Sequence, residues 1–372
     1  MEFDIQRQVF LDGVQKTLGI VERKSTMPIL GNLLIKTEDS HVKIVATDRE
    51  LGLVADYEAQ IASNGQITLS AKKLFEMIRE TQGETIHFSC DDHYQITLTS
   101  QKAVYRIPGV SADEFPSVVY DENVSLYPVS ASLLKELIFK TSFAISNDET
   151  RKNLTGVFLE TEQGNQGTLL KMIATDGHRL AWSYGILEGN PTFNLEKGII
   201  LPRKGISEIR KLIDTEPGDV LIGSDRGMFV LKTANTLLKV SLIDEIYPDY
   251  KRVIPSEQGV RVIFNHDLLL HAMRRMKVIS TEQYNGVVLT LNNNKMIMNS
   301  TNPDVGEAND ELEVAYPGEE VKVGFNVDYL IDAIEVIREE EVLMDVGTSM
   351  KPSVIMPVHN DRFLCVVMPL KL

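Results

Sequence analysis

The chain repeats one pattern three times, and this repeat constrains its fold more than any other feature. Each copy has an apolar segment led by a glycine, a polar turn, and a second apolar segment ending in Thr-Asp or Thr-Asn. The leading glycines are Gly31, Gly156 and Gly286. The residues that end the second segments are Asp48, Asp176 and Asn302, which are 128 and 126 residues apart. Because a regular spacing marks one structural unit used repeatedly, the sequence predicts three domains of one design.

Two helical patterns accompany each copy. Before each glycine, apolar residues recur at steps of three and four, as at Phe10, Val14 and Leu18 in the first copy. A second helix is expected after each turn, within 69–81, 201–214 and 325–337, and an apolar strand follows each one. The residues near the starts of these helices are Ser70, Pro202 and Asn326, which are types that cap a helix or occupy its first turn.

These patterns predict an α+β fold in which strands dominate. We expect three repeated domains, each with two helices and antiparallel sheets. A length of 372 residues agrees with more than one domain. Polar, turn-rich stretches lie near 121–129 and 250–259, so the expected domains are 1–125, 126–253 and 254–372.

Composition and motif patterns argue against a membrane-spanning, a secreted or a metal-binding protein. Hydrophobic residues make up 43% and charged residues 24%, as in ordinary globular chains. No apolar run approaches the roughly 20 residues that span a bilayer, and the first residues lack a signal-peptide pattern. The two cysteines, Cys90 and Cys365, lie in apolar runs and are expected to be buried free thiols of a cytoplasmic protein. No cysteine or histidine spacing indicates a metal site, and no cofactor is expected.

The stretch ATDGHRLAWS places Asp176, His178 and Arg179 within four residues, as an active site might. One hypothesis is therefore an enzyme in which Asp176 and His178 act as an acid–base pair. Against this hypothesis, no nucleophile motif, phosphate loop or metal spacing is present. The aspartate also has counterparts in the other copies, which favours bonding to backbone N–H groups of the turn. The histidine and arginine occur only in the second copy, so their role is particular to it.

Positive charge is concentrated on the expected helices, although the net charge is −15. Five of the six helices carry an excess of lysine and arginine, whereas acids gather in segments such as VGEANDELE. An evenly acidic surface would repel DNA. The distribution instead predicts one basic surface that contacts phosphates without reading base sequence. A scaffold that binds only proteins is the alternative, and the basic helices count against it.

Several motifs, taken in order, resemble the bacterial sliding clamp family, the beta subunit of DNA polymerase III. They are the three copies, PILGNLL, ATDGHRLA, PRKG, YPDYKRVIP, GFNVDYL and the final VVMPLKL. The resemblance covers essentially the whole chain. It implies a head-to-tail homodimeric ring of six similar units, with helices around a hole that holds double-stranded DNA without sequence specificity. It also implies no catalysis, and it implies partners that include the replicative polymerase, the clamp loader and repair proteins.

The resemblance further implies a pocket that binds short peptide motifs of those partners. Leucine, valine, methionine and proline would seat an apolar side chain of the peptide, and arginine and histidine would bond its polar groups. At matching positions of this chain the pocket residues are Arg151, Leu154, Thr175, Gly177, His178, Arg179, Leu180, Pro248, Arg252, Val253, Asn326, Tyr329, Met350, Pro352, Val366, Met368, Pro369 and Leu370. Lys152-Asn153 stands where some family members have two aromatic residues, and MPLKL replaces the more usual MPMRL.

The ring joint implied by the resemblance pairs an edge strand of domain one with an edge strand of domain three. Matching apolar residues are Tyr105 and Ile107 on one side, and Val278 and Ile279 on the other. Pairing two edges would satisfy their exposed N–H and C=O groups. The candidates for DNA contact are Arg23, Lys24, Lys204, Arg274, Arg275 and Lys277.

Overall fold

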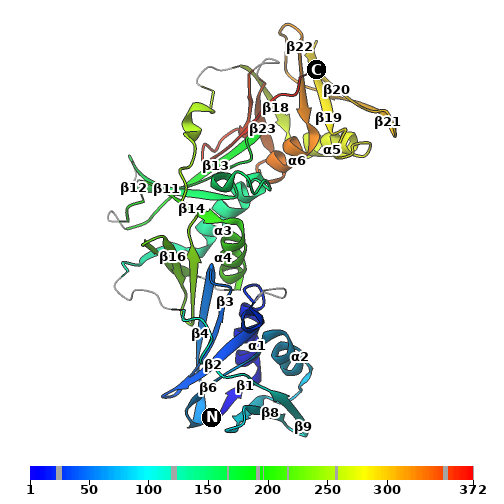
Figure 1. Ribbon diagram of the computed structural model, residues 1–372. Helices are drawn as coiled ribbons and strands as arrows, with labels where there is room; N and C mark the ends of the chain where they lie inside the picture. Colours follow the sequence, from blue (N-terminus) through cyan, green and yellow to red (C-terminus); the bar gives the residue numbers. More distant parts are fainter. Residues whose placement is uncertain are drawn as a thin grey trace. The chain divides into compact units, whose positions relative to one another are not determined.

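The computed structural model describes residues 1–21, 27–118, 124–165, 167–189, 193–195, 197–215, 218–255, 259–346 and 351–371. These residues form six α-helices and 25 β-strands (Figure 1). Every strand pair among them is antiparallel, and the expected α+β fold dominated by strands is confirmed.

The helices occur in pairs, two for each copy of the repeat. They are α1 (Arg7–Thr17), α2 (Ala71–Glu80), α3 (Ala131–Thr141), α4 (Arg203–Thr215), α5 (His266–Lys277) and α6 (Val327–Glu335). The predicted starts of α2, α4 and α6 are confirmed. The Ser70 hydroxyl accepts a hydrogen bond from the Lys73 N–H at 3.4 Å, and the Asn326 side chain accepts one from the Asp328 N–H at 2.9 Å. Helix α4 begins directly after Pro202.

Two sheets contain the strands of the first copy. The five-stranded sheet has the order β5 (Gln60–Ser63), β1 (Glu2–Gln6), β7 (Thr85–Cys90), β8 (Gln95–Ser100) and β9 (Ala103–Pro108). The eight-stranded sheet has the order β10 (Tyr127–Ser130), β15 (Asp219–Asp225), β16 (Met228–Lys232), β17 (Thr236–Ser241), β4 (Leu51–Glu58), β3 (His41–Thr47), β2 (Asn32–Glu38) and β6 (Gly65–Ser70).

Two further sheets contain the strands of the last copy. The second eight-stranded sheet has the order β14 (Ile199–Pro202), β11 (Gly156–Gly164), β12 (Gly167–Thr175), β13 (Arg179–Ile186), β25 (Phe363–Val367), β24 (Ser353–Pro357), β23 (Glu341–Val346) and β18 (Val260–Asn265). The four-stranded sheet has the order β21 (Gly306–Glu313), β20 (Lys295–Asn302), β19 (Gly286–Asn292) and β22 (Val321–Asn326).

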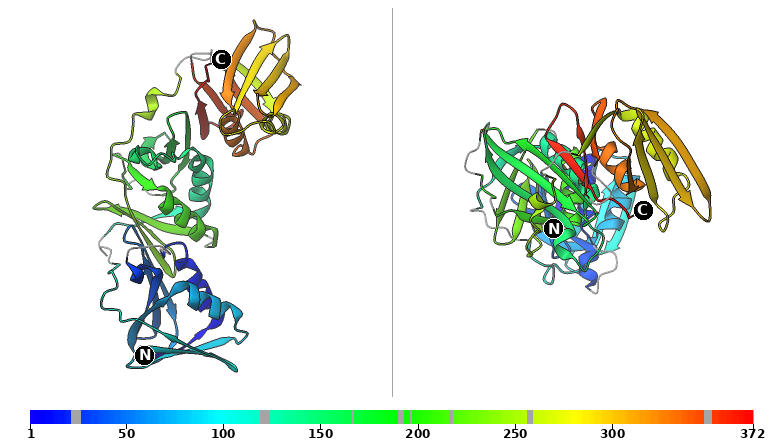
Figure 2. Two further views of the ribbon diagram at one scale, coloured as in Figure 1. Left: turned by 45° about the vertical axis from the view of Figure 1, so that its right-hand side comes forward. Right: turned by 90° about the horizontal axis from the view of Figure 1, so that it is seen from above.

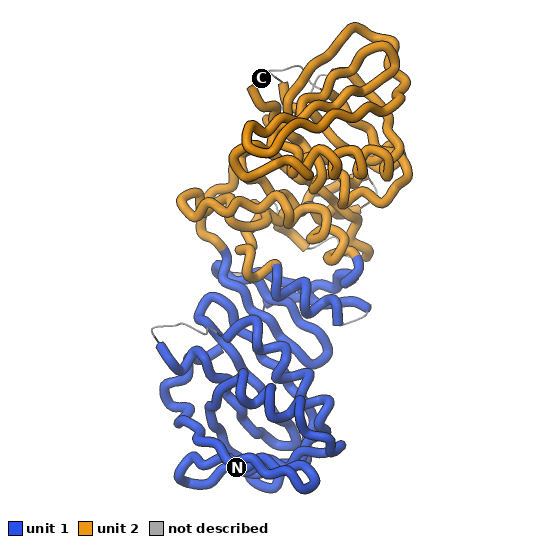
Figure 3. The backbone as a smooth tube through the Cα atoms, turned by 90° about the vertical axis from the view of Figure 1, so that its right-hand side faces the viewer, with its two compact units in different colours: residues 1–132, 207–242 blue, residues 133–206, 243–372 orange. Residues whose placement is uncertain are grey.

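The middle copy contributes strands to both eight-stranded sheets. Its strand β17 pairs with β4 of the first copy, and its strand β13 pairs with β25 of the last. The backbone accordingly divides into two compact units, which consist of residues 1–132 with 207–242 and residues 133–206 with 243–372 (Figure 3). Shared sheets therefore join neighbouring copies of the repeat by continuous hydrogen bonding.

Helices cover one face of the sheets and form the cores with them. In the first unit α1 lies against α2, and in the second α5 lies against α6 (Figure 2). Phe10 of α1 meets Phe3 and Phe88 of the five-stranded sheet, with ring centroids 6.0 and 6.3 Å away. All three rings are completely buried, so the apolar spacing of α1 is explained by the face that it turns to this sheet.

The acidic segment near residue 310 and the two cysteines differ in part from what the sequence predicts. The acidic segment Gly306–Glu313 forms the edge strand β21. Its alternate residues turn toward α5, and the others face solvent. Cys365 is buried, which raises the pKa of its thiol to about 12, whereas Cys90 is only half-buried. No helix of the described residues is long and apolar enough to cross a membrane.

Candidate functional site

The turn between β12 and β13 is shaped by the side chains of Thr175 and Asp176. One carboxylate oxygen of Asp176 accepts hydrogen bonds from the N–H groups of His178 and Arg179, at 2.9 and 3.0 Å. The Thr175 hydroxyl donates to the Arg179 carbonyl at 2.6 Å and accepts from the Gly177 N–H at 3.1 Å. The predicted role of Asp176 in bonding the backbone of its turn is confirmed.

Arg179 is held on every side of its guanidinium group. Its Nε donates to the second oxygen of Asp176 at 3.1 Å, one terminal nitrogen donates to Asp332 of α6, and the other donates to the Phe143 carbonyl at 2.7 Å. The guanidinium carbon lies 4.5 Å from the centroid of the Tyr329 ring. Its side chain is only 10% exposed. Arg179 therefore fixes the turn to α6, and three of its five N–H donors are used within the protein.

Gly177 lets the chain pass close to Arg151. The glycine has a φ of +90°, and a Cβ atom there would lie 2.7 Å from an Arg151 terminal nitrogen. Arg151 donates to the Asp176 carbonyl at 2.9 Å and to the Asp148 carboxylate at 3.0 Å. The absence of a side chain at position 177 thus gives this exposed arginine its place beside the turn.

His178 is exposed and lies over Tyr329. The two ring centroids are 6.3 Å apart, with an angle of 21° between the rings. The His178 imidazole makes no hydrogen bond within the described residues, so it is not paired with Asp176. The carboxylate of Asp176 is already engaged by two N–H groups and Arg179. Burial raises the pKa of the Tyr329 hydroxyl, with a smaller contribution from the nearby Asp176 charge. This geometry favours a contact surface and not an acid–base pair.

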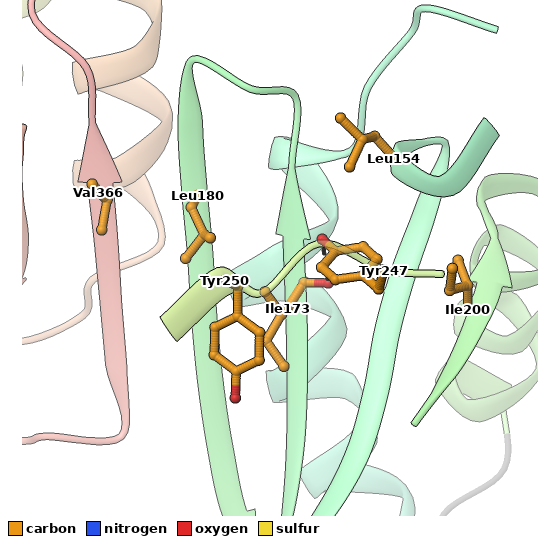
Figure 4. Close-up of a cluster of buried hydrophobic side chains, with 7 residues drawn as sticks. All are labelled: Leu154, Ile173, Leu180, Ile200, Tyr247, Tyr250 and Val366. Atoms are coloured by element: carbon orange, nitrogen blue, oxygen red, sulfur yellow. Dashed lines mark hydrogen bonds between the residues drawn. The ribbon is translucent and has the colours of Figure 1, made fainter. Parts of the chain in front are cut away.

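A buried apolar cluster supports the turn from beneath. It joins residues from β12, β13, β14 and β25, from the 3-10 turn Lys152–Leu154 and from the segment after β17 (Figure 4). Its members are Leu154, Ile173, Leu180, Ile200, Tyr247, Tyr250 and Val366. Tyr250 donates a hydrogen bond from its hydroxyl to Glu160 at 2.6 Å, and burial together with this carboxylate raises the pKa of the tyrosine. Leu154, Leu180 and Val366 are therefore the base of the site and not its surface.

The end of the chain provides the exposed apolar part. The Met368 N–H donates to the His178 carbonyl at 2.9 Å, which extends the pairing of β25 with β13 into the turn. The Leu370 N–H donates to the Gly324 carbonyl at 2.8 Å, beside the start of α6. Met368 and Leu370 remain 38% and 40% exposed, with Pro369 between them. Pro352 directly precedes β24, whose Ser353 pairs with Val367. Two exposed apolar side chains thus lie next to His178 and α6.

The remaining predicted residues are less closely connected to the turn. Arg252 bonds to Asp249 at 2.8 Å, and its side chain is 84% exposed. Pro248 and Val253 are exposed on either side of the buried Tyr250. Asn326 is buried and caps α6, so its side chain supports Tyr329 from the helix start. Met350 lies outside the described residues.

Six residues of the site were not predicted from the sequence. Four of them belong to the buried cluster, namely Ile173, Ile200, Tyr247 and Tyr250, and the other two, Phe143 and Asp332, hold Arg179. The two tyrosines lie in the YPDY motif, which was the sequence signal available for them. No local pattern distinguishes Asp332 from the other acids of α6, since its role comes from a contact 153 residues away.

Three family models match the chain in succession. They are the N-terminal, central and C-terminal domains of the DNA polymerase III beta subunit, which match residues 1–119, 128–249 and 251–371. The chain belongs to this family. The beta sliding clamp of Pseudomonas aeruginosa is 31% identical, and the comparison covers 100% of both chains.

Solved structures of this family share the fold. The crystal structure of the sliding clamp from Caulobacter crescentus has a TM-score of 0.94 and 30% identity, with 100% of each chain covered. That from Bacillus subtilis also has a TM-score of 0.94, at 27% identity, and covers 100% of this chain and 99% of its own. The fold of the DNA polymerase III beta subunit family is therefore retained along the whole chain.

The four candidates for the ring joint lie at an edge strand and at a helix end. Tyr105 and Ile107 alternate along β9, which is the edge of the five-stranded sheet, and both are half-buried. Val278 follows α5 and is 79% exposed, whereas Ile279 is half-buried and its carbonyl accepts a hydrogen bond from Asn302 at 2.8 Å. Val278 and the edge strand β9 are therefore both accessible to a second copy of the chain.

The candidates for DNA contact differ in how their charges are engaged. Arg274, Arg275 and Lys277 of α5 each form an ion pair with an acid of the same unit. Lys204 of α4 is half-buried. Arg23 and Lys24 lie outside the described residues. Arg210 of α4, which the sequence analysis did not select, is exposed and has no ion-pair partner within the ranges that the structure describes.

Proposed function

We propose that the turn 175–179, the chain end 366–370 and the start of α6 together form the surface on which this protein binds short peptides of its partners. The chain is a DNA sliding clamp. It works as a homodimeric ring around double-stranded DNA, and it tethers the replicative polymerase and other replication and repair proteins, which makes synthesis processive. Peptide binding at one surface would serve all of these partners.

One observation carries the proposal, namely the convergence of three distant segments on His178. Its carbonyl accepts from the Met368 N–H at 2.9 Å, and its ring lies 6.3 Å from that of Tyr329. A turn, a strand end and a helix start are thereby joined around two exposed apolar side chains, Met368 and Leu370. Two neighbouring apolar side chains left accessible beside polar groups offer a surface that an apolar side chain of a peptide can cover.

The chemistry of this surface suits a peptide with an apolar residue and free backbone groups. Met368 and Leu370 offer apolar contacts, and the flexible thioether of methionine accommodates ligands of different shape. The exposed imidazole of His178 and the exposed guanidinium of Arg151 can bond a peptide carbonyl or carboxylate. Arg179 acts on the ligand through the turn, because its own nitrogens are engaged within the protein.

Alanine at His178 or Met368 tests the peptide site. We expect each change to weaken binding of a fluorescently labelled short peptide with adjacent Leu and Phe by about thirtyfold, since buried interface anchors contribute about 2 kcal/mol. Glu50→Ala is the matched control, because Glu50 occupies the position of His178 in the turn of the first copy. Equal affinities of the His178→Ala, Met368→Ala and Glu50→Ala proteins, measured by fluorescence polarisation, would move the site elsewhere.

The dimer joint is proposed at β9 and at the residues that follow α5. Tyr105 and Ile107 would meet Val278 and Ile279 of a second copy, which would bury the exposed valine. A charge at this joint would lose its hydration without a partner. We therefore expect Ile279→Asp to yield monomers in analytical ultracentrifugation, with the circular dichroism spectrum retained. A dimer that persists at low concentration would refute this joint.

We also propose that the protein catalyses no reaction and acts in the cytoplasm, as three domains of residues 1–125, 126–253 and 254–372. Two observations support the absence of catalysis. The carboxylate of Asp176 is engaged by backbone N–H groups and Arg179, and within the described residues it is not paired with the His178 ring. Sliding requires only topological retention on DNA with weak phosphate contacts at the helices.

A further inference from the structure

The basic side of α5 is neutralised by acids from two other elements of its own unit. Arg274 bonds to Glu335 of α6 at 2.8 Å, and Arg275 bonds to Asp310 of β21 at 2.7 Å. Lys277 lies 2.5 Å from the carboxylate of Asp328. Three cations thus face three carboxylates, each cation with a separate partner.

These ion pairs are open to solvent. The three basic side chains are 49%, 54% and 54% exposed. Exposed pairs stabilise a fold by only about 0–1 kcal/mol. Stability therefore gives little reason for three of them on one helix face, and a phosphate group can reach and compete for each cation.

The positive charges of α2 and α4 are less completely neutralised. On α2, Lys72 and Lys73 share the single carboxylate of Glu76, so a positive charge remains. On α4, Arg210 is exposed and unpaired in the part of the chain that the structure describes. On α5, by contrast, each of these three cations has its own carboxylate.

We propose that Asp310, Asp328 and Glu335 serve as built-in counter-ions that keep α5 from holding DNA tightly. The inference rests on the proposed function, in which helices line the hole around DNA. A phosphate that binds Arg274 or Arg275 competes with a carboxylate that stays nearby, so the contact is short-lived. The result is a face that contacts DNA yet does not anchor the ring, while Arg210 provides a phosphate contact that needs no such exchange.

Salt dependence separates paired from unpaired cations. Each protein cation that neutralises a phosphate releases a counter-ion condensed on the DNA and adds about 0.9 to the slope of log Kd against log salt concentration. A cation that is already paired with a carboxylate contributes less, because the carboxylate takes up a cation from solution when the phosphate replaces it. Removing the carboxylate should restore the full contribution of its cation.

The experiment uses the full-length protein and a fluorescently labelled DNA duplex, titrated at several potassium chloride concentrations. We expect Glu335→Gln and Asp310→Asn each to tighten binding and to steepen the salt slope by up to about 0.9. Glu320→Gln is the control with the same change of net charge, because Glu320 bonds to the uncharged side chain of Asn292 at 2.9 Å. Sedimentation of each variant establishes that the same oligomer is compared, and this matters for Asp310 on an edge strand.

A second comparison removes the cations themselves. Arg210→Gln should weaken binding and flatten the slope more than Arg275→Gln does. If the parent binds but Glu335→Gln and Asp310→Asn behave as Glu320→Gln, or if Arg275→Gln has as large an effect as Arg210→Gln, the inference is overturned and the proposed function stands. If the parent protein binds no duplex at any salt concentration, the DNA-binding function fails as well.

Discussion

Two turns of the molecule share one backbone design and differ in what they present. In the first copy, Asp48 accepts from the N–H groups of Glu50 and Leu51 at 2.9 and 2.6 Å, as Asp176 accepts from those of His178 and Arg179 in the second. The next strand also joins both turns alike, since the Ser241 N–H bonds to the Glu50 carbonyl and the Met368 N–H to that of His178. The shared bonds form the turn, so function must come from the side chains that differ.

The difference is concentrated at three consecutive positions. Gly177, His178 and Arg179 stand where the first turn has Arg49, Glu50 and Leu51. Leu51 is buried in the first core, whereas Arg179 reaches across to α6. The side chains at these positions thus give the second turn contacts to a distant helix that the first turn lacks, without a change of backbone hydrogen bonding.

The largest expected effect comes from giving the second turn the side chain of the first. Arg179→Leu would leave Asp176 and Asp332 without their shared cation, and unpairing a largely buried ion pair costs about 3 kcal/mol. We expect a lower midpoint of urea unfolding and a loss of peptide binding of at least about tenfold. Arg151→Ala, which removes an exposed arginine beside the same turn, should destabilise by less than about 1 kcal/mol. Equal stabilities of the two variants would contradict the role given to Arg179.

Removing each aspartate tests the shared part of the design. Asp48→Ala and Asp176→Ala each delete an acceptor for two backbone N–H groups, which should destabilise the fold by about 2 kcal/mol. Asp176→Ala should destabilise it further, because Arg179 also loses a partner. Only Asp176→Ala should weaken peptide binding in fluorescence polarisation. Weaker binding by Asp48→Ala as well would mean that the two turns are not functionally distinct.

The smallest expected effect concerns backbone conformation. Arg49 has a φ of +82°, close to the +90° of Gly177, although only glycine adopts this region without strain. We expect Arg49→Gly to raise the free energy of unfolding by up to about 1 kcal/mol. Gly177→Ala should lower it by about 1–2 kcal/mol, since its Cβ would also press on Arg151. If Arg49→Gly and Gly177→Ala shifted the thermal unfolding midpoint in the same direction, the two turns would not share this conformation.

Much of the fold could be predicted from sequence because it depends on local periodicity. Ser70 and Asn326 marked helix starts correctly, and the strands after α2, α4 and α6 lie where apolar runs indicated them. The roles of Asp48 and Asp176 were also predictable, since each aspartate bonds to N–H groups two and three residues away. The acidic strand β21 was not recognised, because an edge strand needs only one apolar face and its alternation is weak.

The sequence by itself determined the threefold repeat, the turns and the helix starts, because each depends on residues close together in the chain. Only the tertiary structure decided which turn gained distant partners. His178 gains its surroundings from Met368 and Tyr329, and Arg179 is fixed by Asp332, through contacts that span 150 residues or more. It also decided that the cations of α5 are matched by acids of α6 and β21. Charge counted along a sequence says nothing about pairing in space, and pairing decides what a charge is free to bind.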